Sequence, residues 1–204
     1  MLHEIYRKLF HILIIFIPIA YSYLGKKTFL SIFVPLAFFI VIADYLRRNF
    51  TKLNAIFIKI FAKIMRQKEL VATNLTGLSY TFIAVAVVFL VAKSQIAIMA
   101  FLILAISDSL AAIVGKSIKS RKFYQKTVAG SLAFFLSALA IVAGCAFYFG
   151  HANNLIYYIC TFIAVIFTTA VEARPEIFEI DDNFLIPFSF AFVASFLDYM
   201  WQFL

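Results

Sequence analysis

The sequence predicts an all-α polytopic membrane protein, from its composition, the length of its apolar runs and the placement of its charges. The 204 residues are 65% hydrophobic and only 14% charged, with a mean hydropathy of +1.00. A soluble core of this size cannot bury that much apolar side chain. The formal net charge is +8, which in a membrane protein reports topology and headgroup contact, so we expect no nucleic-acid partner. No internal repeat or linker divides the chain, and residues 1–204 are expected to form one domain.

Each apolar run is long enough to cross a hydrocarbon layer of roughly 30 Å, and together they predict about seven membrane spans. The first run has no signal-peptide cleavage site after it, so it is interpreted as a span. The runs cover residues 9–25, 28–46, 70–92, 95–115, 127–149, 153–173 and 183–203.

Between the second and third spans, Arg47–Glu69 has a different pattern. Its apolar residues recur at helical spacing, with the lysines mostly on the other face. This pattern predicts an amphipathic helix that lies on the cytoplasmic membrane surface with its basic face toward anionic headgroups. The apolar positions are Leu53, Ile56, Phe57, Ile60, Phe61 and Ile64.

The connections between the spans differ strongly in positive charge. Of the 18 lysines and arginines, only Lys26, Lys27 and Lys93 fall on one side of the predicted membrane. Positive loops stay in the cytoplasm. The N-terminus is therefore predicted inside and the C-terminus outside, in a multi-pass protein of the cell inner membrane.

Asp108 lies inside an apolar run, about 10 Å from Gly115 at the end of the predicted helix. A lone carboxylate at the centre of a membrane helix costs about 2.5–3.5 kcal/mol, so it needs a task or a partner. The loop after Gly115 carries cations and no acid, and Thr127 and Gly130 open the next helix, whose free N–H groups suit a phosphate. The loop cations are Lys116, Lys119, Arg121, Lys122 and Lys126.

Two further polar clusters fall on the same membrane face. Glu4, Arg7, Lys8 and His11 share one face of the first helix, and a second cluster of Glu172, Asp181, Asp182 and Asn183 precedes the last span. Arginine and lysine before a span are also ordinary anchors. Asp181 and Asp182 are also compatible with a solvated turn, with Asn183 capping the helix that follows.

Carboxylates for a divalent metal, cations for phosphate oxygens and a group that orients a hydroxyl are what phosphoryl transfer requires. The predicted site has three parts. The catalytic candidates are Asp108, His11 and Glu172. The phosphate-binding candidates are Arg7, Lys8, Gly115, Lys116, Lys126, Thr127 and Gly130. The metal-binding candidates are Asp108, Asp181, Asp182 and Asn183.

Four blocks of the sequence resemble the membrane lipid kinases that include dolichol kinase, phytol kinase and the CTP-dependent diacylglycerol kinase. Glu4–His11 resembles an E-x-x-R-K-x-x-H opening, and Asp108–Lys116 resembles a G-D-x-x-A-x-x-x-G-K/R block. Lys126–Ser131 is similar to K-S/T-x-x-G-S. Glu172 and Asp181–Asn183 are similar to the closing V-E-x … D-D-N pattern. Ser107 stands where the family's pattern has a glycine before the aspartate.

The resemblance implies transfer of the terminal phosphoryl group of a nucleotide, typically CTP, with Mg²⁺ or another divalent cation, to the hydroxyl of a membrane lipid at the cytoplasmic face. It makes Asp108 the residue most expected to be essential. A polyprenol, a phytol-like alcohol and a diacylglycerol stay open as acceptors, and ATP stays open as donor. A phosphatidate cytidylyltransferase is the alternative enzyme, and a transporter or scaffold that uses Asp108 as an ion relay is the alternative from another class.

Overall fold

The computed structural model describes residues 11–61, 65, 75–174 and 180–201. Five helical segments within them are long and apolar enough to cross a membrane, and the shorter helix Gly77–Val91 is also apolar. The five are His11–Leu46, Ser94–Ser117, Val128–Tyr148, Leu155–Ala173 and Asp182–Trp201. The predicted class, an all-α integral membrane protein, is confirmed at this level.

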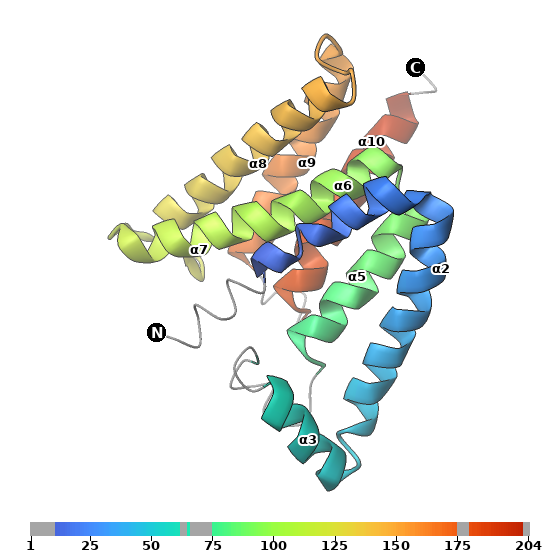
Figure 1. Ribbon diagram of the computed structural model, residues 1–204. Helices are drawn as coiled ribbons and strands as arrows, with labels where there is room; N and C mark the ends of the chain where they lie inside the picture. Colours follow the sequence, from blue (N-terminus) through green and yellow to red (C-terminus); the bar gives the residue numbers. More distant parts are fainter. Residues whose placement is uncertain (1–10, 62–64, 66–74, 175–179, 202–204) are drawn as a thin grey trace.

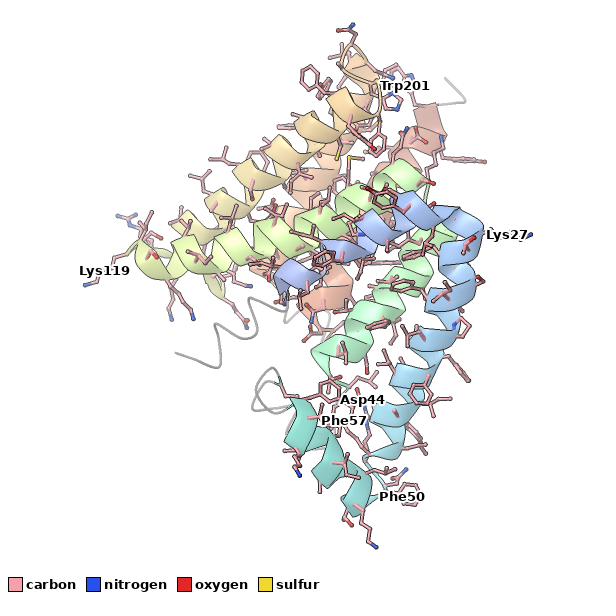
Figure 2. All side chains as sticks on the ribbon, in the orientation of Figure 1. Lys27, Asp44, Phe50, Phe57, Lys119 and Trp201 are labelled. Carbon is pink, nitrogen blue, oxygen red and sulfur yellow. The ribbon has the colours of Figure 1, made fainter. Side chains whose placement is uncertain are left out.

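Helix α2 (Phe16–Leu46) is bent sharply at Gly25, whose φ of 73° is in the region that favours glycine. Figure 1 shows the two legs of α2 meeting at a corner, and Lys27 projects from this corner in Figure 2. The bend lies at the end of the first predicted span. The sequence therefore places the break between the first two apolar runs correctly.

Helix α3 (Thr51–Phe61) occupies the first part of the predicted amphipathic segment, and part of the rest lies outside the described residues. Its side chains are not buried, and Leu53, Ile56 and Ile60 are exposed apolar groups. Helix α5 (Gly77–Val91) follows, capped by Thr76, whose hydroxyl accepts a hydrogen bond from the Ser79 N–H. The residues 70–74 with which its span was predicted to begin lie outside the described part.

The fourth apolar segment is one continuous helical rod with a widened turn in its middle. It consists of α6 (Ser94–Leu102), the π-helix η1 (Ile103–Ser107) and α7 (Asp108–Ser117). The cationic loop that follows contains a short antiparallel hairpin of β1 (Lys122–Phe123) and β2 (Lys126–Thr127). Helices α8 (Val128–Tyr148), α9 (Leu155–Ala173) and α10 (Asp182–Trp201) complete the chain.

Helix α10 packs against α9, α5 and α6, while α7 packs against α8. Figure 1 shows α7 and α8 on one side of the molecule and α2 and α5 on the other. Phe29, Phe89 and Phe101 are completely buried where α2, α5 and α6 meet, with neighbouring ring centroids 4.9 and 5.3 Å apart. This aromatic core fixes the positions of the helices whose ends form the site.

Candidate functional site

Asp108 begins α7 directly after the π-helix. Its backbone N–H bonds to the carbonyl oxygen of Ile103, five residues earlier, in place of the usual four. Such wide turns inside α-helices are frequent at functional sites, because the extra residue re-aims the side chains that follow. Asp108 is only 7% exposed. The pattern of the sequence did not predict this turn.

His11 and Asp108 meet although they are far apart in the sequence. The Nδ1 atom of His11 lies 3.4 Å from Oδ2 of Asp108, and both side chains are buried. The two groups form an ion pair when the imidazole is protonated. Two of the three predicted catalytic residues are therefore brought together.

Lys126, the first residue of β2, reaches the other acids of the predicted site. Its ammonium nitrogen is 3.0 Å from Oε1 of Glu172 and 3.6 Å from Oδ2 of Asp182. Partial burial lowers the pKa of the amine, but three neighbouring carboxylates outweigh this effect and raise the pKa of Lys126 above its ordinary value. These carboxylates are, in order of effect, those of Asp182, Glu172 and Asp108. Lys126 thus stays charged and lies within the field of all three acids.

Several buried polar atoms of this region have no hydrogen-bond partner in the part of the chain that the structure describes. Glu172 is 1% exposed, and only its Oε1 atom is paired with Lys126, which leaves Oε2 without a partner. The other such atoms are Ser107 Oγ, Ser131 Oγ and Asn183 Oδ1. Buried polar groups are normally hydrogen-bonded, so unpaired ones next to charged side chains are the expected signature of a polar ligand or ion.

The three residues before and at the start of α10 have three different tasks. The Asp181 carboxylate accepts a hydrogen bond from the Asn183 N–H at 3.1 Å, so Asp181 caps the helix. The Asn183 side chain donates to the carbonyl oxygen of Gly77 at 3.1 Å and ties α10 to α5. Only Asp182 faces Lys126. The interpretation of Asn183 as the cap is wrong, because the helix already begins at Asp182.

Among the described residues, no group of three His, Cys, Asp or Glu side chains is placed to hold a metal ion. Mg²⁺ rarely needs such a cage, since it commonly takes one or two protein carboxylates together with substrate phosphates and water. Glu172 and Asp182 both reach the same ammonium group, and Glu172 has a free buried oxygen. This donor set fits a phosphate-bound Mg²⁺.

Gly115, Thr127 and Gly130 lie where α7 crosses the start of α8. A Cβ on Gly115 would lie 2.8 Å from Oγ1 of Thr127, and a Cβ on Gly130 would lie 2.9 Å from the carbonyl oxygen of Ala111. The Thr127 hydroxyl accepts the Gly130 N–H at 3.1 Å. These residues are explained by close helix packing and capping, and phosphate binding by them stays a prediction.

The remaining phosphate-binding candidates are more distant or are not described. Lys116 is exposed in the last turn of α7. Arg7 and Lys8 lie outside the described residues, as does Glu4. The hairpin therefore turns one of its predicted cations, Lys126, toward the acids, whereas Lys119, Arg121 and Lys122 are exposed.

One buried polar cluster was missed by the sequence reasoning. Asp44 is completely buried, and its carboxylate accepts hydrogen bonds from the Arg47 guanidinium at 2.5 Å, the Thr76 N–H at 2.7 Å and the Ser79 hydroxyl at 2.6 Å. Figure 2 shows Asp44 beside α3, near Phe57. The signal was present in the sequence as an acid three residues before an arginine at the end of an apolar run. These contacts are structural.

Comparison with known proteins gives two relatives that match almost the full length. The uncharacterized protein RP860 of Rickettsia prowazekii (strain Madrid E) is 32% identical over 195 residues, which cover 95% of this chain and 94% of that protein. The uncharacterized protein MJ1137 of Methanocaldococcus jannaschii is 29% identical over 196 residues, with 95% and 94% covered. No family model and no solved structure matches the chain. Its identity to RP860 over nearly the whole of both chains shows that the protein belongs to the same family as that Rickettsia protein.

Proposed function

We propose that this protein is a lipid kinase that transfers the terminal phosphoryl group of CTP, with Mg²⁺, to the hydroxyl of a membrane lipid. One observation carries the proposal: Lys126 lies between Glu172 and Asp182 and within the field of Asp108, which contacts His11. Phosphoryl transfer needs fixed positive charge for the phosphate oxygens and carboxylates for the metal and the attacking hydroxyl. The resemblance of four sequence blocks to the lipid kinases supports the same reaction.

The proposed arrangement in the membrane has seven crossings, with the N-terminus and the site on the cytoplasmic side of the inner membrane. The two legs of α2 on either side of Gly25 count as two crossings, and the shorter α5 as one. The orientation follows from the excess of lysine and arginine on the side of the hairpin.

Glu172 and Asp182 are the residues that would hold Mg²⁺, because both are close to one cation and Glu172 keeps an unpaired oxygen. When bound there, Mg²⁺ supplies positive charge that offsets the charge on the transferring phosphoryl group. Lys126 binds the phosphate oxygens, and its burial between acids strengthens its electrostatic effect relative to an exposed lysine.

Asp108 accepts the proton of the lipid hydroxyl as that oxygen attacks the terminal phosphorus, and His11 holds the Asp108 carboxylate in position. The bond between the terminal phosphorus and its bridging oxygen breaks, and the nucleoside diphosphate CDP leaves with that oxygen. The lipid reaches the site laterally from the bilayer, so its chain never crosses water. Acceptors of this kind are polyprenols, phytol-like alcohols and diacylglycerols.

The test uses the purified full-length protein in detergent with Mg²⁺, labelled CTP or ATP, and undecaprenol, farnesol, phytol or diacylglycerol. We expect labelled lipid phosphate from the wild type. Asp108→Asn should lower the rate about 100-fold or more, the range of a general base. Asp198→Asn is the matched control. It makes the same chemical change, but Asp198 lies about 24 Å along α10 from Asp182 and therefore away from the site.

Two outcomes would contradict the proposal. Formation of a CDP-lipid from phosphatidate, without any lipid phosphate, would assign a cytidylyltransferase. If folded wild-type protein gave neither product, the proposal of an enzyme would be wrong. The next measurement would be ion-coupled transport that depends on Asp108.

A further inference from the structure

The hairpin of residues 118–127 is too small to hold its own shape. Its ladder consists of two residue pairs, Lys122 with Thr127 and Phe123 with Lys126. Isolated hairpins, even longer ones, are marginally stable in water. At its tip Tyr124 has a φ of 55°, a left-handed conformation that is unfavourable for a bulky residue. Contacts outside the hairpin must therefore hold it.

Two contacts hold the hairpin to the same turn of α9 and its end. At the tip, the guanidinium carbon of Arg174 lies 3.3 Å from the centroid of the Tyr124 ring, which is a cation–π contact. At the start of β2, directly after the turn, Lys126 pairs with Glu172 at 3.0 Å. Glu172 and Arg174 are two residues apart, so one short piece of chain at the end of α9 contacts both the turn and the strand that follows it.

Two hydrogen bonds connect the base of the hairpin to α8. The Val128 N–H donates to the Arg121 carbonyl oxygen at 3.0 Å, and the Ala129 N–H donates to the Ser120 hydroxyl at 3.1 Å. Neither restrains the tip. A lysine has a long flexible stem, and ordering it costs conformational entropy. A strand that is held at its tip offers the Lys126 ammonium a far smaller range of positions than a free loop does.

We propose that the contact between Tyr124 and Arg174 is a clasp that positions Lys126 against Glu172 and Asp182. Tyr124 and Arg174 are positioning residues, and they act on phosphate binding through Lys126. The geometric part of this inference stands by itself, and its consequence for catalysis rests on the proposed kinase function.

The first experiment measures the position of Lys126 without any reaction of the enzyme. Full-length protein in nanodiscs is treated with a water-soluble acetylating reagent, and mass spectrometry gives the rate at Lys126 relative to exposed Lys119 of the same loop. In the wild type Lys126 reacts slowly, because its side chain is 29% exposed and ion-paired. Tyr124→Ala should raise the relative rate about threefold to tenfold. This is the factor by which the loss of one cation–π contact of moderate strength shifts the equilibrium between the held and the released hairpin.

Two variants serve as controls. Tyr124→Phe keeps the ring face and should label as the wild type does. Tyr148→Ala removes another exposed tyrosine side chain, at the far end of α8, and should also change nothing. If Tyr124→Ala leaves the relative rate at Lys126 unchanged, or if Tyr124→Phe is as disruptive as Tyr124→Ala, the clasp is refuted.

The second experiment asks whether the clasp serves the reaction. In the kinase assay, Tyr124→Ala should raise KM for the nucleotide by about the same factor as the labelling rate, with a smaller change in kcat, and Tyr124→Phe should restore both. An unchanged KM in an active enzyme would refute the role in phosphate binding. If the wild type has no kinase activity, the proposed function fails, while the labelling result still decides the clasp.

Discussion

The charge state of Lys126 depends on its acidic neighbours. Lys126 touches both Glu172 and Asp182, and Glu172 is 1% exposed. Removing the cation leaves a buried carboxylate without its counter-charge, which costs more than the contact itself contributes. The stability of this end of the protein and its chemistry therefore depend on the same group.

Lys126→Gln should lower the free energy of unfolding by about 1–3 kcal/mol, the cost of an unsatisfied buried group. The measurement is denaturation in mixed detergent micelles, followed by circular dichroism. Lys122→Gln is the matched control, because Lys122 is exposed on the same hairpin, and it should change the value by less than about 0.5 kcal/mol. Equal effects of the two changes would contradict the role of Lys126.

The pH dependence of this difference has a defined sign. The pKa of Lys126 is raised above its ordinary value of 10.5 by the surrounding acids, against the opposing effect of burial. A raised pKa means that the folded protein binds the proton more tightly than the unfolded chain, so the stabilisation is complete below pH 10.5 and falls as the pH rises through the folded pKa. The gap between wild type and Lys126→Gln should thus stay constant from neutral to mildly alkaline pH and shrink only above that value.

At the scale of elements, the crossing of α7 and α8 has the least room for change. Gly130→Ala would place a Cβ 2.9 Å from the backbone oxygen of Ala111, and backbone cannot move aside cheaply. We expect a loss of stability of about 1–3 kcal/mol from this overpacking. Gly144→Ala in the same helix is the control, because nothing lies within 4 Å of the added atom. Alanine is the better helix former, so this change should be neutral or slightly stabilising. The measurement is thermal unfolding of both variants in the same detergent. A lower stability of Gly144→Ala than of Gly130→Ala would contradict the prediction.

The Asp44 cluster connects α2, α3 and α5 and gives a second prediction at this scale. Asp44→Asn leaves Arg47, which is 1% exposed, without a full counter-charge. Breaking such a buried pair costs about 3–5 kcal/mol. The ion pair of Lys93 with Asp198 is exposed, so Asp198→Asn should cost at most about 1 kcal/mol. Chemical denaturation of both variants decides the case, and a loss for Asp44→Asn no greater than that for Asp198→Asn would contradict it.

The sequence predicted the helical elements better than the contacts between them. The spans from residue 95 onward and the break at Gly25 follow from hydrophobicity and from one glycine. The π-turn before Asp108 could not be read from the apolar pattern, because nearly every residue of this run is apolar and buried, so the pattern has no polar face that would reveal a shift. The contact of Tyr124 with Arg174 joins an exposed and a partly buried residue that are far apart in the chain, and the packing of α9 beside the hairpin brings them together.

The site residues show the same division. Placing the polar clusters on one membrane face predicted that they lie near one another, and the structure brings His11 to Asp108 and Lys126 to Glu172 and Asp182. That placement was not enough to separate the roles of neighbours in one cluster. Asp181, Asp182 and Asn183 are consecutive, yet a helix start directs them to a cap, to Lys126 and to α5.

At the scale of the whole molecule, the helix ends divide the polar groups into two sets. Lys126 and Glu172 lie beside Asp182 at the start of α10, whereas the ion pair of Lys93 with Asp198 lies near the other end of α10. In Figure 2 Lys119 and Lys27 project from different corners of the molecule. Seven crossings with the site inside require these two lysines to lie on opposite sides of the membrane, since three crossings separate them.

Single cysteines at these positions test that arrangement in cells. The two native thiols, Cys145 and Cys160, are buried and are replaced by alanine in the background. Lys27→Cys should react with a membrane-impermeant maleimide added to intact cells, whereas Lys119→Cys should react only after the membrane is opened. The physical reason is the positive charge around Lys119, which is costly to translocate. Lys93→Cys provides the control for Lys27→Cys, because both lie on the side with few cations. Reaction of Lys27→Cys and Lys119→Cys from the same side would exclude an odd number of crossings between the two positions. If both reacted from outside, the site would not lie on the cytoplasmic face, where the nucleotide is.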